Sequence, residues 1–261
     1  MSNFITYKNA KIHFTDKGKG NVILLLHGFL ENISMWHNLC PHLIKTNRVI
    51  CVDLLGHGKS DSIGYIHTME LMADAVYCVL NHLQIKSVIV IGHSMGGYVS
   101  LALLEAHPNL VKGMCLMNST AVADSSEKQI NRDRAITAVK ENYKTFVSVS
   151  IANLFRPKSR TIHKEAYQIV KREALKISVQ SIIASLEGMK IRKDRLQLFR
   201  HSKILKLVIL GKKDTILNYK TQQSYYKDSD VIVVEFPDGH MSHIENKEDF
   251  TYNIMHFIEN I

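Results

Sequence analysis

A serine in a glycine-rich turn is the clearest candidate for chemistry in this chain. Ser94 lies at the centre of Gly92–Gly96, which reads Gly-His-Ser-Met-Gly and fits the pattern G-x-S-x-G. The β-branched run Val88–Ile91 before it predicts a buried strand, and apolar residues at helical spacing follow over Tyr98–Ala106. A sharp turn from strand to helix exposes the serine hydroxyl and leaves the next N–H free to bind an oxyanion. The alternative is a glycine-rich turn with an ordinary serine cap.

A serine hydroxyl is a weak nucleophile at neutral pH, so it needs a base, and the base needs a carboxylate to orient it. Histidine suits the base because its pKa lies near neutral pH, and His240 and His243 both follow the last predicted strand. Asp214 stands just past the strand expected at 204–210, where sheet folds place their ligands. Asp124 is a weaker candidate for the acid. The two histidines are also a candidate metal site, but the sequence offers no evident third ligand.

The composition is that of a globular protein with a substantial core. The 261 residues are 46% hydrophobic, enough for one large α/β domain with an insertion or for two small domains. No apolar run approaches the length of a transmembrane helix, and the N-terminus has no apolar signal segment. The four cysteines are widely spaced and form no C-x-x-C pair. These features predict a reduced, cytoplasmic protein.

Positive charge is concentrated in one segment. The net charge is +9, and residues 121–195 hold 16 Lys and Arg against 8 Asp and Glu, whereas the rest of the chain is nearly balanced. This difference marks the segment as a separate unit. Its charges either attract anionic partners or lie on the solvated faces of surface helices, and we favour the second interpretation. No alternation of basic and aromatic residues indicates a nucleic-acid partner.

Strands alternate with helices over most of the chain, which predicts right-handed crossovers and a mostly parallel sheet. We expect strands at 4–8, 11–15, 22–26, 48–53, 88–91, 111–117, 204–210 and 231–236, with the first two joined in a hairpin by Asn9-Ala10. We expect helices at 33–46, 68–83, 98–106, 218–227 and 247–259, with a break near Pro41 in the first. Residues 125–193 show helical periodicity and no clear strand, which predicts a helical insertion between two parts of the sheet.

This order of elements, with five motifs at strand ends, resembles the α/β-hydrolase fold and, within it, the helical-cap serine hydrolases. The motifs resemble the oxyanion loop, the D-x-x-G-x-G-x-S turn, the nucleophile elbow, the acid loop and the histidine loop. They are, in that order, His27-Gly28-Phe29, Asp53–Ser60, Gly92–Gly97, Gly211–Asp214 and Asp238–Met241. The resemblance covers nearly the whole chain. It implies a core domain of residues 1–120 and 197–261, with helices flanking the sheet, and an inserted helical cap of residues 121–196.

The resemblance also implies a role for each site residue. These are Ser94 as nucleophile, His240 as base, Asp214 as acid, and the backbone N–H groups of Phe29 and Met95 as the oxyanion hole. Some relatives take the acid from the end of the preceding strand, where this chain has Asn118. His27 is expected to orient the oxyanion loop through hydrogen bonds. His93 is expected to be structural, near the pocket wall.

The predicted reaction is hydrolysis of a carboxylic ester through an acyl-enzyme. A serine at the elbow argues against epoxide or haloalkane chemistry, for which an aspartate would stand there. We expect a mostly apolar pocket for a small to medium substrate, with Ser94 at its floor. Its candidate side chains are Leu30, Phe146, Leu154, Phe155, Met189 and Met241, besides Phe29 and Met95. The expected partner is a small-molecule substrate, and no cofactor, metal, nucleic acid or membrane span is implied.

Two other functions stay open. Carbon–carbon bond hydrolases and lyases of this fold use the same triad, among them enzymes similar to meta-cleavage product hydrolases and to the menaquinone-pathway synthase. In the synthase an arginine typically follows the elbow glycines, where this chain has Tyr98, although Arg132, Arg134 or Arg156 of the cap could replace it. The third hypothesis is a ligand receptor that uses the cap as a moving lid and recruits a partner.

Overall fold

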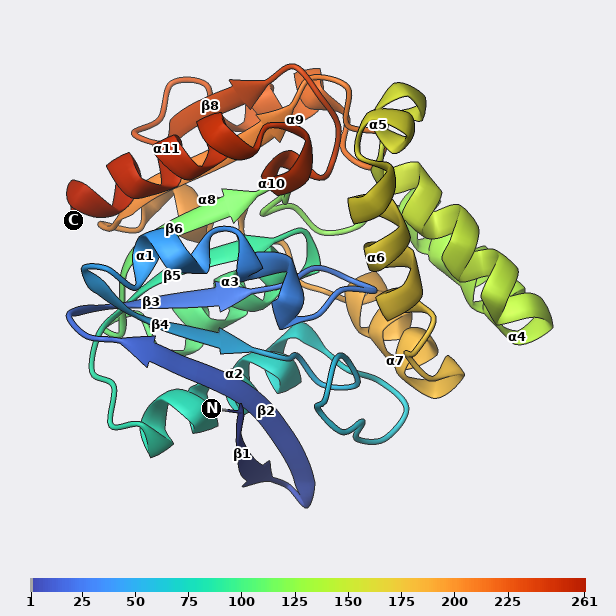
Figure 1. The fold of residues 1–261 in the computed structure, drawn as a ribbon, viewed down its shortest axis with the longest axis horizontal. Helices are drawn as coiled ribbons and strands as arrows, with labels where there is room; N and C mark the ends of the chain where they lie inside the picture. The colour runs from blue at the N-terminus through green and yellow to red at the C-terminus, as the bar shows by residue number, and fades with distance from the viewer. Residues whose placement is uncertain (1) are drawn as a thin grey trace.

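A central eight-stranded sheet carries helices on both of its faces (Figure 1). The computed structural model describes residues 2–261. The strands are β1 (Ser2–Tyr7), β2 (Ala10–Gly18), β3 (Asn21–Leu26), β4 (Asn47–Val52), β5 (Val88–His93), β6 (Val111–Met117), β7 (Leu205–Gly211) and β8 (Ile232–Phe236). Their order is β1-β2-β4-β3-β5-β6-β7-β8, with antiparallel pairing of β1 with β2 and of β2 with β4. All other neighbours are parallel, as predicted.

Alternating side chains of the strands enter two separate cores. The helices against the sheet are η1 (Ile33–His37), α1 (Cys40–Leu43), α2 (Met69–His82), α3 (Met95–Ala106), α8 (Leu196–His201), α9 (Tyr219–Tyr226), α10 (Ser242–Glu245) and α11 (Lys247–Glu259). On β3, Leu24 joins the core shared with α2 and α3, whereas its neighbour Ile23 joins the core shared with α1 and α11. Because both faces are covered, the central strand β5 is buried along its whole length.

The first hairpin turns one residue earlier than we expected. Lys8 and Asn9 are its turn residues, with φ of 46° and 68°, and Ala10 pairs with Tyr7 inside the ladder. Positive φ at both turn positions gives the backbone twist that matches two antiparallel strands. The turn is therefore Lys8-Asn9 and not Asn9-Ala10.

The helix expected at 33–46 is two short helices. η1 and α1 are separated by Asn38-Leu39, and Pro41 lies in the first turn of α1. Proline has no N–H to donate, so it fits the start of a helix and not its interior. The four-residue helix α10 was not expected, because one turn is too short to show helical periodicity in the sequence.

The chain between β6 and β7 is helical, as its periodicity predicts. Besides α8 it forms α4 (Ser126–Leu154), α5 (Pro157–Ile162), α6 (Lys164–Ala174) and α7 (Val179–Lys190). These four helices lie together on the side toward which the arrowheads of the parallel strands point (Figure 1), and α4 contacts both α6 and α7. The boundaries of a cap domain at residues 121 and 196 stay a prediction.

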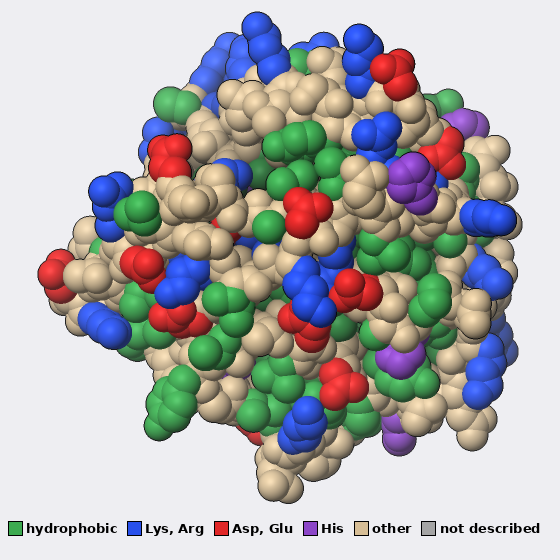
Figure 2. Space-filling view, turned by 180° about the vertical axis from the view of Figure 1, so that it is seen from behind, with side chains coloured by type: hydrophobic (Ala, Val, Ile, Leu, Met, Phe, Trp, Pro, Cys, Tyr) green, Lys and Arg blue, Asp and Glu red, His purple; other side chains and the backbone are tan. Residues whose placement is uncertain are grey.

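Many charges of this segment are paired. Lys190 contacts Asp133 and Glu187 at 2.6 and 2.7 Å. Figure 2 shows positive and negative side chains interspersed over the face seen from behind. None of the helices between residues 2 and 261 combines the length and the apolar character of a membrane span.

Candidate active site

Ser94 lies between the last residue of β5 and the first residue of α3. Its φ of 49° and ψ of −115° form a strained conformation that only strong local constraints maintain. The neighbouring glycines make room for the turn. A Cβ on Gly92 would lie 2.5 Å from Ser100 Oγ, and a Cβ on Gly96 would overlap the carbonyl oxygen of Leu26. The turn therefore requires glycine at both places and presents Ser94 at the carboxyl end of the sheet.

His240 and Asp214 come from the loops after β8 and β7 and meet in a buried hydrogen bond. His240 Nδ1 lies 2.7 Å from Asp214 Oδ2, and their side chains are 1% and 2% exposed. Asp214 Oδ1 accepts from the N–H groups of Ile216 and Leu217 at 2.8 and 3.0 Å. Burial opposes ionisation of Asp214, but the charge and hydrogen bond of His240 and these amides outweigh it and lower the pKa of Asp214. The ionised carboxylate can only accept, so Nδ1 carries the proton.

Asn118 connects the two loops. Its Nδ2 donates to Asp214 Oδ2 at 3.3 Å and to the carbonyl oxygen of Gly239 at 3.2 Å. Its Oδ1 accepts from Ser242 Oγ at 2.7 Å. One buried side chain at the end of β6 thus holds the acid loop against the histidine loop. In the sequence this position stands out only because it is not a carboxylate.

Ser94 and His240 line the same cavity, which has a volume of about 200 Å³. Its other lining residues are Phe29, Leu30, His93, Tyr98, Arg132, Ser150, Asn153, Leu154, Met189 and Ile216. Nε2 of His240 is buried and has no hydrogen-bond partner within residues 2–261. When the ring is neutral, the proton on Nδ1 leaves Nε2 a free lone pair that can accept a proton.

The backbone N–H groups of Phe29 and Met95 are available to form an oxyanion hole. In the described part of the chain, neither Phe29 N–H nor Met95 N–H has an acceptor. Met95 is the first residue of α3, so its N–H also lies at the positive end of a helix dipole. His27 fixes the loop that carries Phe29. Its Nε2 accepts from Leu54 N–H at 2.9 Å, so its Nδ1 donates to Gly28 O at 2.8 Å.

A buried ion pair that our sequence analysis missed lies behind Ser94. Glu31 Oε2 accepts from His93 Nδ1 and from Gly28 N–H, both at 2.7 Å. His93 Nε2 donates to the carbonyl oxygen of His240 at 3.0 Å. The side chains of His93 and Glu31 are 1% and 3% exposed. The pair therefore joins the oxyanion loop, the nucleophile elbow and the histidine loop.

Both members of this pair are charged. Burial disfavours charge on Glu31, but the charge of His93 and its hydrogen bond lower the pKa of Glu31 to about 2. Burial likewise opposes charge on His93, and Glu31 outweighs it and raises the pKa of His93. A Cβ on Gly28 would lie 2.5 Å from Glu31 Oε2 and 3.2 Å from Ser94 Cβ. Only a glycine at 28 therefore lets the pair pack this close to Ser94.

Acid is expected to destabilise the protein through Glu31. Because its folded pKa of about 2 lies below its ordinary 4.5, its contribution to stability is complete above pH 4.5 and is lost as the pH falls toward 2. By linkage, the loss is on the order of 3 kcal/mol. Urea unfolding at pH 6 and pH 3 should therefore show a larger loss of stability in the wild type than in Glu31→Gln. The exposed control Glu248→Gln should follow the wild type, and equal losses in all three proteins would contradict the prediction.

The structure divides the predicted pocket residues into two groups. Three of them line the cavity together with Phe29, namely Leu30, Leu154 and Met189. Three others do not line it, namely Phe146, Phe155 and Met241. Phe155 and Met241 are buried in the core and Phe146 packs against that core. The side chain of Met95 is also in the core, so Met95 offers the site only its backbone.

The competing acid and base lie outside the His240–Asp214 pair. Asp124 accepts from Arg132 at 2.5 Å and contacts Arg192 at 2.7 Å. His243 is buried and has no hydrogen-bond partner among the described residues, and burial lowers its pKa to about 3. Within residues 2–261, no group of three His, Cys, Asp or Glu side chains is arranged to hold a metal ion.

The geometry of the elbow and of the histidine loop agrees with the comparison to known proteins. The sequence model of one family, described as the alpha/beta hydrolase fold, matches residues 21–247. The chain therefore belongs to the alpha/beta hydrolase family.

Relatives within this family carry different activities. The structure of a thermophilic esterase from Thermogutta terrifontis, with malate bound, superposes with a TM-score of 0.91 at 28% identity, covering 100% of this chain and 98% of that one. The 2-hydroxymuconate semialdehyde hydrolase of Pseudomonas sp. (strain CF600) is 33% identical over 112 residues, 41% of this chain and 40% of that protein. The 2-hydroxy-6-oxo-6-(2'-aminophenyl)hexa-2,4-dienoic acid hydrolase of Metapseudomonas resinovorans is 23% identical over 268 residues, 99% of this chain and 91% of that protein. In several other curated relatives the match spans 35% of their length.

Proposed function

We propose that this hydrolase cleaves a carboxylic ester of a small to medium, mostly apolar substrate through an acyl-enzyme on Ser94. The observation that carries the proposal is the placement of the two ring nitrogens of His240. Asp214 holds its Nδ1 at 2.7 Å, while its Nε2 is unpartnered among the described residues and lies at the cavity that Ser94 also lines. The similarity to an esterase supports the substrate class.

In the first half of the reaction Ser94 Oγ attacks the carbonyl carbon of the ester as His240 Nε2 takes its proton. The charge that forms on the carbonyl oxygen is stabilised by Phe29 N–H and Met95 N–H, and each such donor is worth roughly 2.7–4 kcal/mol. The carboxylate of Asp214 stabilises the imidazolium. The carbon–oxygen bond to the alcohol then breaks, the alcohol takes the proton from His240, and the acyl group stays on Ser94.

The second half releases the acid. A water molecule gives one proton to His240 Nε2 and attacks the acyl carbon of the Ser94 ester. The same two amides stabilise the oxyanion again. When the bond to Ser94 Oγ breaks, the serine takes the proton back from His240, so the free enzyme is restored.

Substitution of Glu31 by glutamine is expected to lower kcat for p-nitrophenyl acetate by about 10- to 100-fold, because small misplacements of catalytic groups cost this much. A neutral amide no longer keeps His93 charged, which weakens the contact of His93 with His240 O and loosens the oxyanion loop. We expect little change in KM. We also expect the decline of kcat at alkaline pH to begin at a lower pH than in the wild type. The matched control is Glu248→Gln, exposed on α11. A folded Glu31→Gln protein with wild-type kcat would show that the pair is structural only.

Chain length tests both the reaction and the pocket. A cavity of about 200 Å³ is somewhat larger than the roughly 150 Å³ that hold benzene, which predicts an optimum at acyl chains of about four to six carbons. We would measure hydrolysis of p-nitrophenyl esters from acetate to decanoate. Leu154→Ala should shift the optimum to longer chains, whereas Val149→Ala, exposed on α4, should not. If the Ser94→Ala variant matches the wild-type rate at every length, the protein is not an esterase of this kind.

One observation favours a second candidate, a carbon–carbon bond hydrolase. Arg132 lines the cavity with Ser94 and could bind a substrate carboxylate, and two relatives are named for hydrolysis of 2-hydroxymuconate semialdehyde and of a related dienoic acid. However, Asp124 already pairs with Arg132, which is why we place esters first. At Tyr98, where the synthase-like enzymes have an arginine, the guanidinium of Arg192 lies 4.1 Å from the ring centroid. Faster turnover of an anionic diketone than of any ester would favour this second candidate.

A further inference from the structure

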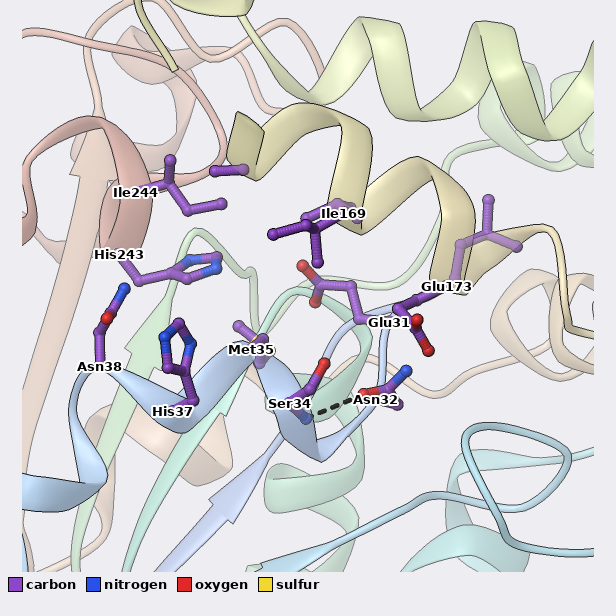
Figure 3. Close-up of a pocket in the computed structure, with 13 residues that line it drawn as sticks. Glu31, Asn32, Ser34, Met35, His37, Asn38, Ile169, Glu173, His243 and Ile244 are labelled. Carbon is purple, nitrogen blue, oxygen red and sulfur yellow. Dashed lines mark hydrogen bonds between the residues drawn. The ribbon is translucent and has the colours of Figure 1, made fainter. Parts of the chain in front are cut away.

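A second cavity lies next to the oxyanion loop. Its volume is about 90 Å³, and it is lined by residues of η1, α6 and α10 (Figure 3). Leu30 lines this cavity and also the cavity that holds Ser94. The apolar part of its wall is formed by Met35, Ala166, Ile169, Val170 and Ile244.

Two buried polar side chains that line this cavity have polar atoms without partners among the described residues. Among residues 2–261, Glu31 Oε1 and both ring nitrogens of His243 have no hydrogen-bond partner. Glu31 is 4% exposed and His243 is 5% exposed. Figure 3 shows both side chains directed into the space beside Ile169 and Ile244. Because buried polar groups in proteins nearly always find partners, an occupant of this cavity that supplies them would satisfy both side chains.

The charge states of these groups define the occupant. With a pKa of about 2, Glu31 is ionised at neutral pH, so its Oε1 only accepts hydrogen bonds. Burial lowers the pKa of His243 to about 3, so its neutral ring offers one donor and one acceptor. A hydroxyl group matches this set, since it can donate to Glu31 and accept from His243. Glu31 would repel a carboxylate. A cation would lose its hydration beside a carboxylate that His93 already neutralises.

We propose that this cavity binds a small aliphatic alcohol, with its hydroxyl between Glu31 and His243 and its alkyl group against Ile169 and Val170. Benzene occupies an engineered cavity of about 150 Å³, so a volume of about 90 Å³ suits three or four non-hydrogen atoms, the size of 2-propanol. Ester hydrolysis releases an alcohol, and the shared residue Leu30 places this cavity where it can receive one. That assignment of the occupant rests on the proposed function, whereas the binding itself does not.

Binding is tested in the Ser94→Ala variant, in which hydrolysis plays no part, by NMR titration of the histidine ring resonances. We expect 2-propanol to shift the His243 signals saturably, with half-saturation in the millimolar range because the ligand is so small. Acetone has the same shape but no O–H to donate to Glu31, so it should bind at least about tenfold more weakly. A Glu31→Gln substitution should weaken the binding of 2-propanol and leave the binding of acetone nearly unchanged.

Two tryptophan variants test the location. Ile169 lies at the cavity and is 47% exposed, so Ile169→Trp should fold, fill the cavity and abolish the shifts. Ile162 on α5 is 60% exposed and does not line the cavity, so Ile162→Trp should bind like the parent. Equal saturation by acetone, unchanged binding to Ile169→Trp, or a response that never saturates would mean adventitious solvent only and overturn the proposal. Absence of any shift would assign these polar groups to water. Neither failure bears on the ester hydrolysis assay, which uses the protein with Ser94.

Discussion

Replacement of His240 by glutamine is expected to lower kcat for p-nitrophenyl butyrate by about 10⁴- to 10⁶-fold. Without Nε2 of His240, the other imidazole that lines this cavity among residues 2–261 is His93, whose two ring nitrogens already donate to Glu31 and to the carbonyl oxygen of residue 240. The rate that remains comes from substrate binding and from the amides of Phe29 and Met95. Steady-state kinetics on protein shown to be folded by circular dichroism measures the effect. The control His201→Gln, exposed on α8, should keep kcat within a few-fold of the wild type.

The result also discriminates between the two histidines of this loop. A wild-type kcat in the His240→Gln protein would exclude His240 as the base and leave His243 as the other candidate in this loop. The structure argues for a large loss of kcat in His240→Gln, because Asp214 is bonded to His240, whereas His243 lies against the ring of Trp36, with 6.3 Å between centroids.

Replacement of Asp214 by asparagine is expected to cost about 10⁴-fold in kcat, with little change in KM. In the proposed mechanism the carboxylate accepts a hydrogen bond from Nδ1–H of His240 and stabilises the imidazolium that forms when Ser94 attacks. A neutral amide accepts a weaker hydrogen bond and stabilises the imidazolium less. Where its NH₂ group faces the ring, it favours the wrong tautomer of His240. The isosteric control is Asp249→Asn, exposed on α11, which should have wild-type kinetics. A loss of less than tenfold would show that Asp214 is not the acid of the triad.

Much of the fold is readable in the sequence because the strands of a covered parallel sheet are continuous apolar runs. β6 and α11 have the bounds that the sequence predicts, 111–117 and 247–259. Helix α2 is shorter by one residue at each end, because Thr68 caps it with its side chain and Leu83 ends it. The predicted turn of the first hairpin was wrong by one residue. Its register depends on pairing between Tyr7 and Ala10, which local turn chemistry does not determine.

The residues expected to form the triad are also readable, since each follows a strand and carries a recognisable motif. The supporting residues are not readable in this way. Glu31 bonds to Gly28 nearby, but His93 is 62 residues away from it in the chain. Asn118 bonds to Asp214 over 96 residues and to Gly239 over 121. Contacts of this range depend on the order of the strands in the sheet, which the sequence shows only through the resemblance.

The pocket was predicted least well because large apolar side chains serve a pocket and a core equally. Leu154 lines the cavity, whereas its neighbour Phe155 packs against Tyr167 in the core, with 5.5 Å between ring centroids. The helix that carries Leu154 ends there, so the direction of each side chain depends on how α4 meets α5. The polar lining residues Ser150 and Asn153 carry no apolar signal at all.

The central claim is that Ser94 is a nucleophile activated by His240, and covalent labelling tests it most directly. We would treat the protein with an alkyl fluorophosphonate and follow labelling by intact-protein and peptide mass spectrometry. The account predicts one adduct per chain, on the peptide that contains Ser94, with no adduct in Ser94→Ala and a labelling rate reduced by about 10⁴-fold or more in His240→Gln. An unlabelled wild type, an adduct on another residue, or equal labelling rates in wild type and His240→Gln would contradict it.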